Sequence, residues 1–363
     1  MSHENPSHLK IILTIALKDI KGAIKDNLTL GVIIGVFLLI LPSQLIPLIL
    51  QNESKPQAVI FSSQPSSLTR DLSELPGTSA YTAESLLEMR NEIASGRSQV
   101  IGLSLPEEFQ EKIASNEQII IDGFVAHWSS REETQQLVQH FEKHISQITG
   151  SPVQITLVDN QVHPGKDSRG SEVMFILQMI NAIMTISLVL VPHLLMVEKE
   201  KHTLDALLVT PASFTDLIIG KGLAGAFYGS LGAFLVIIMN TRIIAHWWLL
   251  ILTALSGICF AVLLGLLVGL LFDNFQQATL AMSAIVTLAI APAFITLILT
   301  IDLPEFLETI INWLPSAQIS NLILVSLMKT VEIRAVILGM AGIWTANLLL
   351  FGLNTWKIQQ QLK

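Results

Sequence analysis

The chain has 363 residues, of which 51% are hydrophobic and only 14% are charged, and its formal net charge is −8. These proportions predict an α-helical polytopic membrane protein and exclude an ordinary soluble globular chain. The single cysteine, Cys259, falls within an apolar segment, so the protein is expected to fold without disulfides.

Residues 8–26 near the N-terminus form a basic amphipathic segment. Lysines at positions 10, 18, 21 and 25 recur near helical spacing beside leucine, isoleucine and alanine residues. A helix with this pattern can lie in the headgroup layer of a membrane. The segment 1–27 is therefore predicted to be a cytoplasmic amphipathic helix, and membrane anchoring alone would also account for it.

Six segments are long and apolar enough to be membrane spans. A span needs about 20 apolar residues to cross a hydrocarbon core of roughly 30 Å. The qualifying segments are 28–50, 172–197, 217–241, 246–272, 275–300 and 335–356. The first has no cleavage site before Gln51 and is read as a retained anchor. Most Lys and Arg residues near the span ends fall on one side, which predicts a plasma (inner) membrane protein with both termini cytoplasmic.

Residues 51–170 are then extracytoplasmic, and they show the pattern of a soluble α/β domain. Predicted strands cover 59–61, 100–103, 119–125 and 153–158, and Ser130 with Glu133 matches a capping box that begins a helix. The segment contains 16 acidic and 9 basic residues, a net −7 of the chain's −8. Solubility explains this acidity, and attraction of a cation is the alternative.

The second predicted span contains two amide side chains, Gln178 and Asn181. These amides are expected either to make hydrogen bonds between helices or to line a substrate path. No Asp, Glu, Lys or Arg lies at the centre of any predicted span, which disfavours a carrier driven by protons or sodium ions.

A charged segment, residues 198–216, follows the second span. It begins with Glu198, Lys199, Glu200 and Lys201, continues with an apolar row, and meets a helix breaker at Pro211. The apolar row consists of Leu204, Leu207 and Leu208 at i, i+3, i+4 spacing, so one helical face can dock on an apolar surface. The alternative is that the charges only mark the membrane boundary.

Residues 302–330, between the fifth and sixth spans, are apolar but interrupted by prolines. Backbone that is not helical survives at membrane depth only where protein covers it or where it faces water. This segment is therefore predicted to pack near the outer mouth of a pathway, with Trp313 as a candidate interfacial anchor.

The charged segment resembles the cytoplasmic loop of the membrane (permease) subunits of ATP-binding cassette exporters of the type-two class. That loop reads Glu-x-Glu-x-x-Thr-Leu, then Leu-Leu-x-Thr-Pro, then Gly-Lys. The matching residues here are Glu198, Glu200, Thr203, Leu204, Leu207, Leu208, Thr210, Pro211, Gly220 and Lys221. The resemblance implies that residues 1–27 are the family's connecting helix, that 302–330 is an outer re-entrant segment, and that 198–216 touches an ATPase.

The same resemblance implies the chain's function and partners. The chain would be a half-transporter that pairs with an identical or homologous permease and with separate nucleotide-binding ATPase subunits, and it would export a hydrophobic or amphiphilic substrate. It contains no Gly-x-x-x-x-Gly-Lys-Ser/Thr phosphate loop, so ATP and Mg are expected to bind the partner. No catalytic, cofactor or metal residue and no nucleic-acid partner is expected here. The alternative is a membrane-anchored sensor or assembly scaffold whose outer domain binds a ligand.

Overall fold

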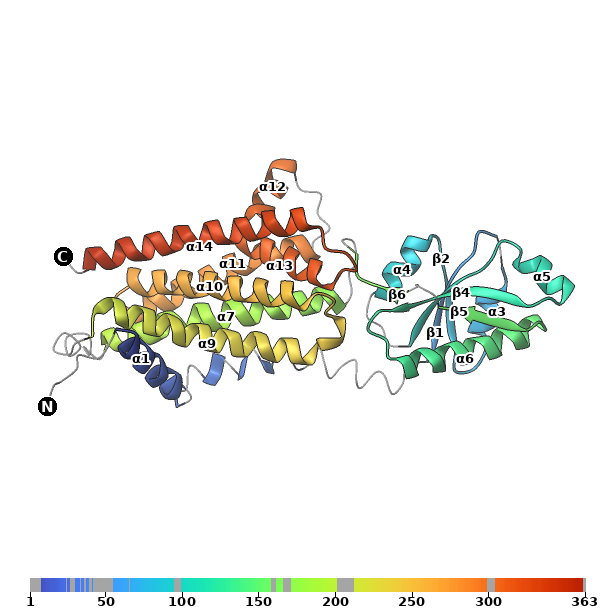
Figure 1. Ribbon diagram of the computed structural model, residues 1–363, viewed down its shortest axis with the longest axis horizontal. Coiled ribbons are helices and arrows are strands. Elements are labelled where there is room, and N and C mark those ends of the chain that lie inside the picture. The colour runs from blue at the N-terminus through green and yellow to red at the C-terminus, as the bar shows by residue number, and fades with distance from the viewer. Residues whose placement is uncertain are drawn as a thin grey trace. The chain divides into compact units, whose positions relative to one another are not determined.

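The computed structural model describes most of the chain, which divides into two compact units. The described residues are 8–23, 25–26, 55–64, 66–94, 99–157, 161–165, 171–200, 212–298 and 304–361, with a few positions between 30 and 41. A helical unit comprises residues 1–42, 175–326 and 330–363, and an α/β unit comprises 43–174 with 327–329. Most elements of both units are labelled in Figure 1.

The α/β unit alternates strands with helices along the chain. Its elements are β1 (Gln57–Phe61), α3 (Leu68–Ser73), β2 (Ser79–Ala83), α4 (Leu86–Ala94), β3 (Val100–Ser104), α5 (Phe109–Ser115), β4 (Ile119–Ala126), α6 (Arg131–Thr149), β5 (Val153–Thr156) and β6 (Gln161–Val162). The sheet order is β2-β1-β3-β4-β5, and β6 pairs with β4 beyond this path. Only the β3–β4 pairing is antiparallel among the pairings of the described strands.

Helices cover both faces of this sheet. One face packs Ile60 and Leu103 against Leu72 of α3 and Phe141 of α6, whereas the other packs neighbouring strand residues against α4. Adjacent residues of β1 and β3 therefore enter different cores, which explains why these two strands are buried without alternation. In contrast, β4 exposes Ile120 and Asp122, and β5 exposes Gln154. The predicted capping box is present, because the Ser130 hydroxyl accepts from the Glu133 amide and the Glu133 carboxylate accepts from the Ser130 amide.

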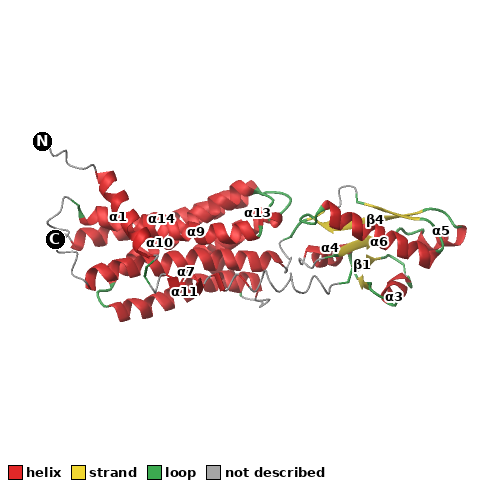
Figure 2. Ribbon diagram, turned by 90° about the horizontal axis from the view of Figure 1, so that it is seen from below, coloured by secondary structure: helices red, strands yellow, loops and turns green. Residues whose placement is uncertain are grey.

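The helical unit contains long apolar helices (Figure 2). Its elements are α1 (His8–Ala23), α7 (Ser171–Glu200), α9 (Phe214–Met239), the 3-10 helix η1 (Thr241–Ile243), α10 (Trp247–Leu271), α11 (Phe275–Ile298), α12 (Glu305–Trp313), α13 (Pro315–Leu327) and α14 (Ile333–Gln361). Within the described residues, five helices are long and apolar enough to cross a membrane: α7, α9, α10, α11 and α14.

These five helices coincide with five of the six predicted spans, and their ends differ by a few residues. The helix α9 begins at Phe214, three residues before the predicted start, because Ser213 and Asp216 form a second capping box that the sequence analysis missed. The first predicted span, 28–50, lies mostly outside the described residues.

The predicted re-entrant segment contains a sharply bent helix pair. The axes of α12 and α13 differ by 80° across Leu314, and the two helices together are long and apolar enough to form a sixth span. The end of α13 is joined to the start of α10, because the Ser326 carbonyl accepts from the backbone amides of Ala245 and His246 at 3.1 and 2.8 Å. A bend of this size fits a re-entrant segment and also fits a broken sixth span, so the re-entrant segment stays a prediction.

Candidate coupling site

The amphipathic helix α1 lies along the first half of α9. Gly220 permits the close approach, since a Cβ atom built there would lie 2.7 Å from Cγ2 of Ile15 and 3.2 Å from the Ile12 carbonyl oxygen. Near this contact, the Tyr228 hydroxyl donates to the Ile20 carbonyl at 2.6 Å. The Gly-Lys pair of the sequence motif therefore begins with a residue whose missing side chain makes room for α1.

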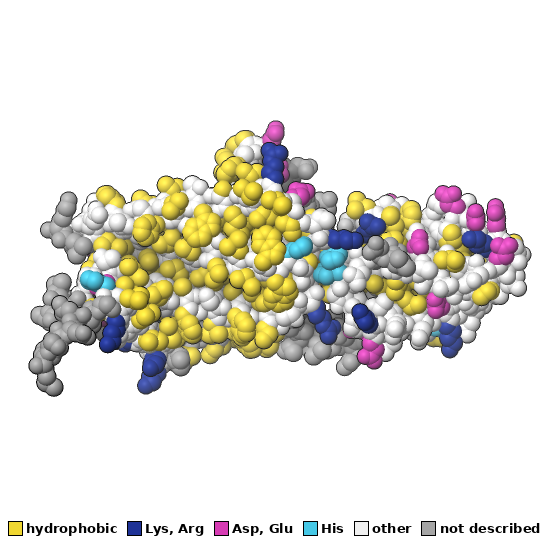
Figure 3. Space-filling view, viewed as in Figure 1, with side chains coloured by type: hydrophobic (Ala, Val, Ile, Leu, Met, Phe, Trp, Pro, Cys, Tyr) yellow, Lys and Arg dark blue, Asp and Glu magenta, His cyan; other side chains and the backbone are white. Residues whose placement is uncertain are grey.

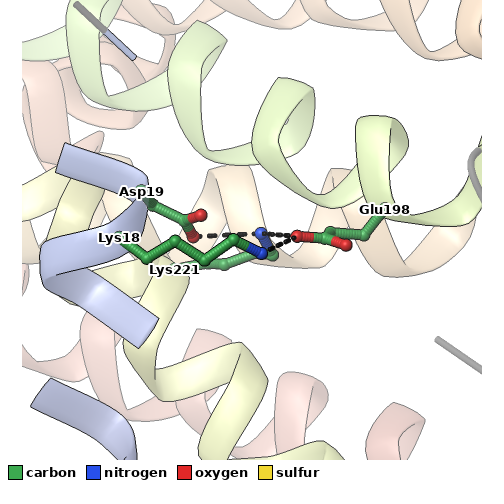
Figure 4. A network of polar contacts seen from close by, with 4 residues as sticks. All are labelled: Lys18, Asp19, Glu198 and Lys221. Carbon is green, nitrogen blue, oxygen red and sulfur yellow. Dashed lines mark hydrogen bonds and ion pairs between the residues drawn. The ribbon is translucent and has the colours of Figure 1, made fainter. Parts of the chain in front are cut away.

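The lysine of that pair, Lys221, is buried between two carboxylates. It is only 1% exposed, and its Nζ lies 3.0 Å from Oδ2 of Asp19 on α1 and 3.4 Å from Oε1 of Glu198 on α7 (Figure 4). The same Glu198 oxygen lies 3.3 Å from Nζ of Lys18, whose side chain is largely exposed. We call Lys18, Asp19, Glu198 and Lys221 the buried ion network. It joins α1 to α7 and α9, across sequence separations of 180 and 202 residues.

The charges of this network balance, with two lysines facing two carboxylates. Desolvating each of the three buried ions, Asp19, Glu198 and Lys221, costs several kcal/mol, and this cost is offset only when every buried charge has close partners. Removing one member therefore leaves an uncompensated charge in a buried position. The network stabilises one arrangement of α1, α7 and α9 and penalises arrangements that separate its members.

The end of α7 is fixed by two further polar contacts. Nζ of Lys199 donates to the Phe272 carbonyl at 2.7 Å and lies 2.8 Å from Oδ1 of Asp273, at the end of α10. Six residues earlier, Nε2 of His193 lies 3.1 Å from Oδ2 of Asp26. The segment of α7 that precedes residue 201 is therefore connected to the chain before the first span, to α9 and to α10.

Glycines let α7 pack closely against its neighbours. On α9, a Cβ atom at Gly225 would collide with Val191, and one at Gly229 would collide with the Ser187 hydroxyl. On α10, a Cβ atom at Gly269 would lie 2.6 Å from Cδ1 of Leu195. Small residues at such contacts allow helix backbones to approach closely inside a membrane. A displacement of α7 would therefore also displace α9 and α10.

The sequence-predicted site residues fall into three groups. Glu198 lies in the buried ion network, and Glu200 is exposed at the last position of α7. The docking candidates Thr203, Leu204, Leu207, Leu208 and Pro211 lie outside the described residues. Asp19 and Lys18 were missed as site residues, because contacts between residues about 200 positions apart leave no local pattern.

The two substrate-path candidates share a partly exposed stripe of α7. Gln178 and Asn181 are one turn apart, and the Thr185 hydroxyl donates to Oδ1 of Asn181 at 2.8 Å. Residues spaced by three and four positions lie on one face of a helix. Thr185 extends the predicted polar pair by one turn.

The long apolar helices and the ion pairs at their ends define a membrane-embedded protein. The family model described as ABC-2 family transporter protein matches residues 28–354. The chain therefore belongs to that family, as a membrane (permease) subunit, which confirms the resemblance seen in residues 198–221. No curated protein and no solved structure matches the chain.

Proposed function

We propose that this permease subunit exports a hydrophobic or amphiphilic substrate from the cytoplasm, driven by a separate ATPase subunit that binds ATP and Mg. One observation carries the proposal: the end of α7, which leads directly into segment 198–216, is joined by ion pairs to both α1 and α9. A force applied to that segment reaches three helices at once. The working unit contains two permeases, identical or homologous, and two ATPase subunits.

In the proposed mechanism, closure of the ATPase subunits on ATP displaces segment 198–216. Glu198 transmits the displacement to α1 and α9 because it contacts Lys18 and Lys221. Because α7 packs closely on glycines of α9 and α10, it cannot shift without moving these helices. The second span then shifts against the partner permease. Gln178, Asn181 and Thr185 form the polar stripe that this movement exposes to substrate.

The proposal is tested by reconstituting the chain with its ATPase subunit and measuring assembly, ATP hydrolysis and transport together. Glu198→Gln should leave assembly intact and lower the amount of substrate moved per ATP. Glu200→Gln is the matched comparison, and its effect should be smaller because Glu200 is exposed. Equal transport per ATP in the parent and in Glu198→Gln would contradict the proposed mechanism. ATP hydrolysis by the permease alone would contradict the proposal that a separate subunit is the ATPase.

Docking of the charged segment is tested by a double substitution. Leu207→Asp combined with Leu208→Asp removes apolar burial of about 1.5–3 kcal/mol per side chain and adds the cost of burying charge. The complex with the ATPase should dissociate, although the permease still inserts in the membrane. Normal assembly and transport by the double variant would show that segment 198–216 only connects two spans and does not dock on the ATPase.

The proposed orientation is tested with an impermeant thiol reagent on intact cells, in a Cys259→Ala background. Ser130→Cys, in the α/β unit, should be labelled, and Ser213→Cys, before α9, should be labelled only after permeabilisation. The reverse pattern would invert the topology and place the ATPase contact elsewhere.

A further inference from the structure

The helix α1 presents two different faces. The face that packs on α9 contains Ala16 and Asp19, which are 4% and 7% exposed. Another face leaves Leu9, Leu13 and Leu17 exposed at 66%, 47% and 54%. A leucine row of this size on an exposed helix face has a cost in water, and the neighbouring helix does not cover it.

The leucine row has a basic border. At 3.6 residues per turn, Leu9, Leu13 and Leu17 lie on one side of the helix, and Lys10 and Lys21 lie roughly 60–80° further round, away from the packed face. Both lysines are exposed. An apolar row bordered by lysines on one side and by the bundle on the other is the arrangement of a helix that lies in the plane of a membrane surface.

The part of α9 that contacts α1 also has exposed apolar side chains. Ile219 and Leu223, which flank the Gly220 contact with α1, are 44% and 42% exposed. These apolar side chains belong to a helix long enough to cross a membrane, so its lipid-facing surface already begins at the level of α1. The leucine row of α1 and these exposed side chains of α9 therefore both suit contact with lipid.

We propose that α1 is a binding surface for anionic phospholipid, with the leucine row inserted among the acyl chains and Lys10 and Lys21 on the phosphate groups. The assignment to the inner leaflet rests on the proposed function, because it uses the cytoplasmic orientation of α1. Lysines at a membrane surface favour anionic lipids. Since Lys18 and Asp19 of the buried ion network belong to the same helix, bound anionic lipid holds α1 in the position at which that network forms.

The proposal is tested on the full-length protein in nanodiscs, without ATPase or ATP. In a Cys259→Ala background, Leu13→Cys carries an environment-sensitive fluorophore. The discs contain either phosphatidylcholine alone or phosphatidylcholine with phosphatidylglycerol. Brominated lipid should quench the probe several-fold more strongly in the anionic discs. Lys10→Gln with Lys21→Gln should abolish that difference, and the matched pair Lys112→Gln with Lys143→Gln, in the α/β unit, should retain it.

Two results would overturn the proposal. Equal quenching in neutral and anionic discs would remove the anionic lipid as the ligand. A probe that stays accessible to aqueous iodide in both discs, and becomes protected only when the ATPase subunit is added, would make the leucine row a protein-docking face. The second result leaves the proposed export function intact, whereas loss of that function is detected separately by the transport assay.

Discussion

The two units of the molecule differ in the ion pairs that they bury and in the apolar side chains that they expose. The two core clusters of the α/β unit consist of apolar residues, whereas in the helical unit Asp19, Glu198 and Lys221 are buried together and leucines such as Leu280 and Leu348 are strongly exposed. Figure 3 shows the difference as a mainly hydrophobic surface on the helices and scattered charges on the α/β unit. Apolar cores are stabilised in water, whereas exposed leucines and buried ion pairs are typical of helices that are surrounded by lipid. Polar contacts therefore specify the helical unit, where apolar burial alone has little selectivity.

Replacing the buried lysine should give the largest effect of this comparison. Lys221→Met leaves Asp19 and Glu198 without their shared cation, and breaking a buried pair in this way costs about 3–5 kcal/mol. Thermal unfolding in detergent should show a large decrease in Tm for Lys221→Met and almost none for Lys143→Met, which alters an exposed lysine of α6. Adding Asp19→Asn and Glu198→Gln to Lys221→Met should restore much of the loss. An unchanged Tm for Lys221→Met would show that the network contributes nothing to stability.

Filling a glycine contact should give the next largest effect. Gly229→Leu forces a side chain against Ser187 of α7, and overpacking of this kind costs about 1–3 kcal/mol. Gly352→Leu, in α14, is the control because a Cβ atom there meets nothing within 4 Å. Thermal unfolding of the two variants side by side measures the difference. Equal stability of both variants would mean that α7 and α9 are not closely packed.

In the α/β unit, the capping box of α6 offers a smaller and local effect. Ser130→Ala removes the side-chain acceptor of the Glu133 amide and should cost about 1 kcal/mol. Hydrogen exchange should become faster in the first turns of α6, whereas Ser115→Ala, on the exposed surface of α5, should change little there. Unchanged exchange in Ser130→Ala would argue that Glu133 alone holds the start of the helix.

The smallest effect is expected from pH, through a partly exposed histidine of α6. Burial and the neighbouring His144 and Lys143 lower the pKa of His140 from 6.5. Below that value the unfolded chain binds more protons than the folded chain, so stability falls as the pH falls through and below 6.5. Hydrogen exchange of α6 peptides, corrected for intrinsic rates, should show this loss, and His140→Gln should reduce it. The same pH dependence in His140→Gln would assign the loss to another group.

The contrast between the units also explains what could be predicted from the sequence. Predicted strands correspond to β1, β3, β4 and β5, because each contains large apolar residues that pack in a core. The strand β2, Ser-Ala-Tyr-Thr-Ala, was missed because it contains a single large side chain. Span positions were predictable because a membrane demands length and apolarity. The side of each span that is buried in the bundle could not be predicted, because nearly every residue around these helices is apolar.

The candidate site shows the same limit. The motif at 198–221 includes Glu198, Gly220 and Lys221, but the motif does not explain why glycine and lysine are needed at positions 220 and 221. Lys221 counted only as a positive charge near a membrane boundary, whereas the structure pairs it with Asp19, 202 residues away. A local pattern can identify such residues without revealing their partners.

The contact between α10 and α14 has a consequence for motion. Asn347 and Asn354, one heptad apart on α14, donate to the carbonyls of Ser256 and Leu263, one heptad apart on α10, at 3.3 and 2.9 Å. Two rungs with the same spacing fix the register of the two helices, since sliding by one residue would break both. We therefore expect α10 and α14 to keep their register and to move together in any rearrangement of the bundle.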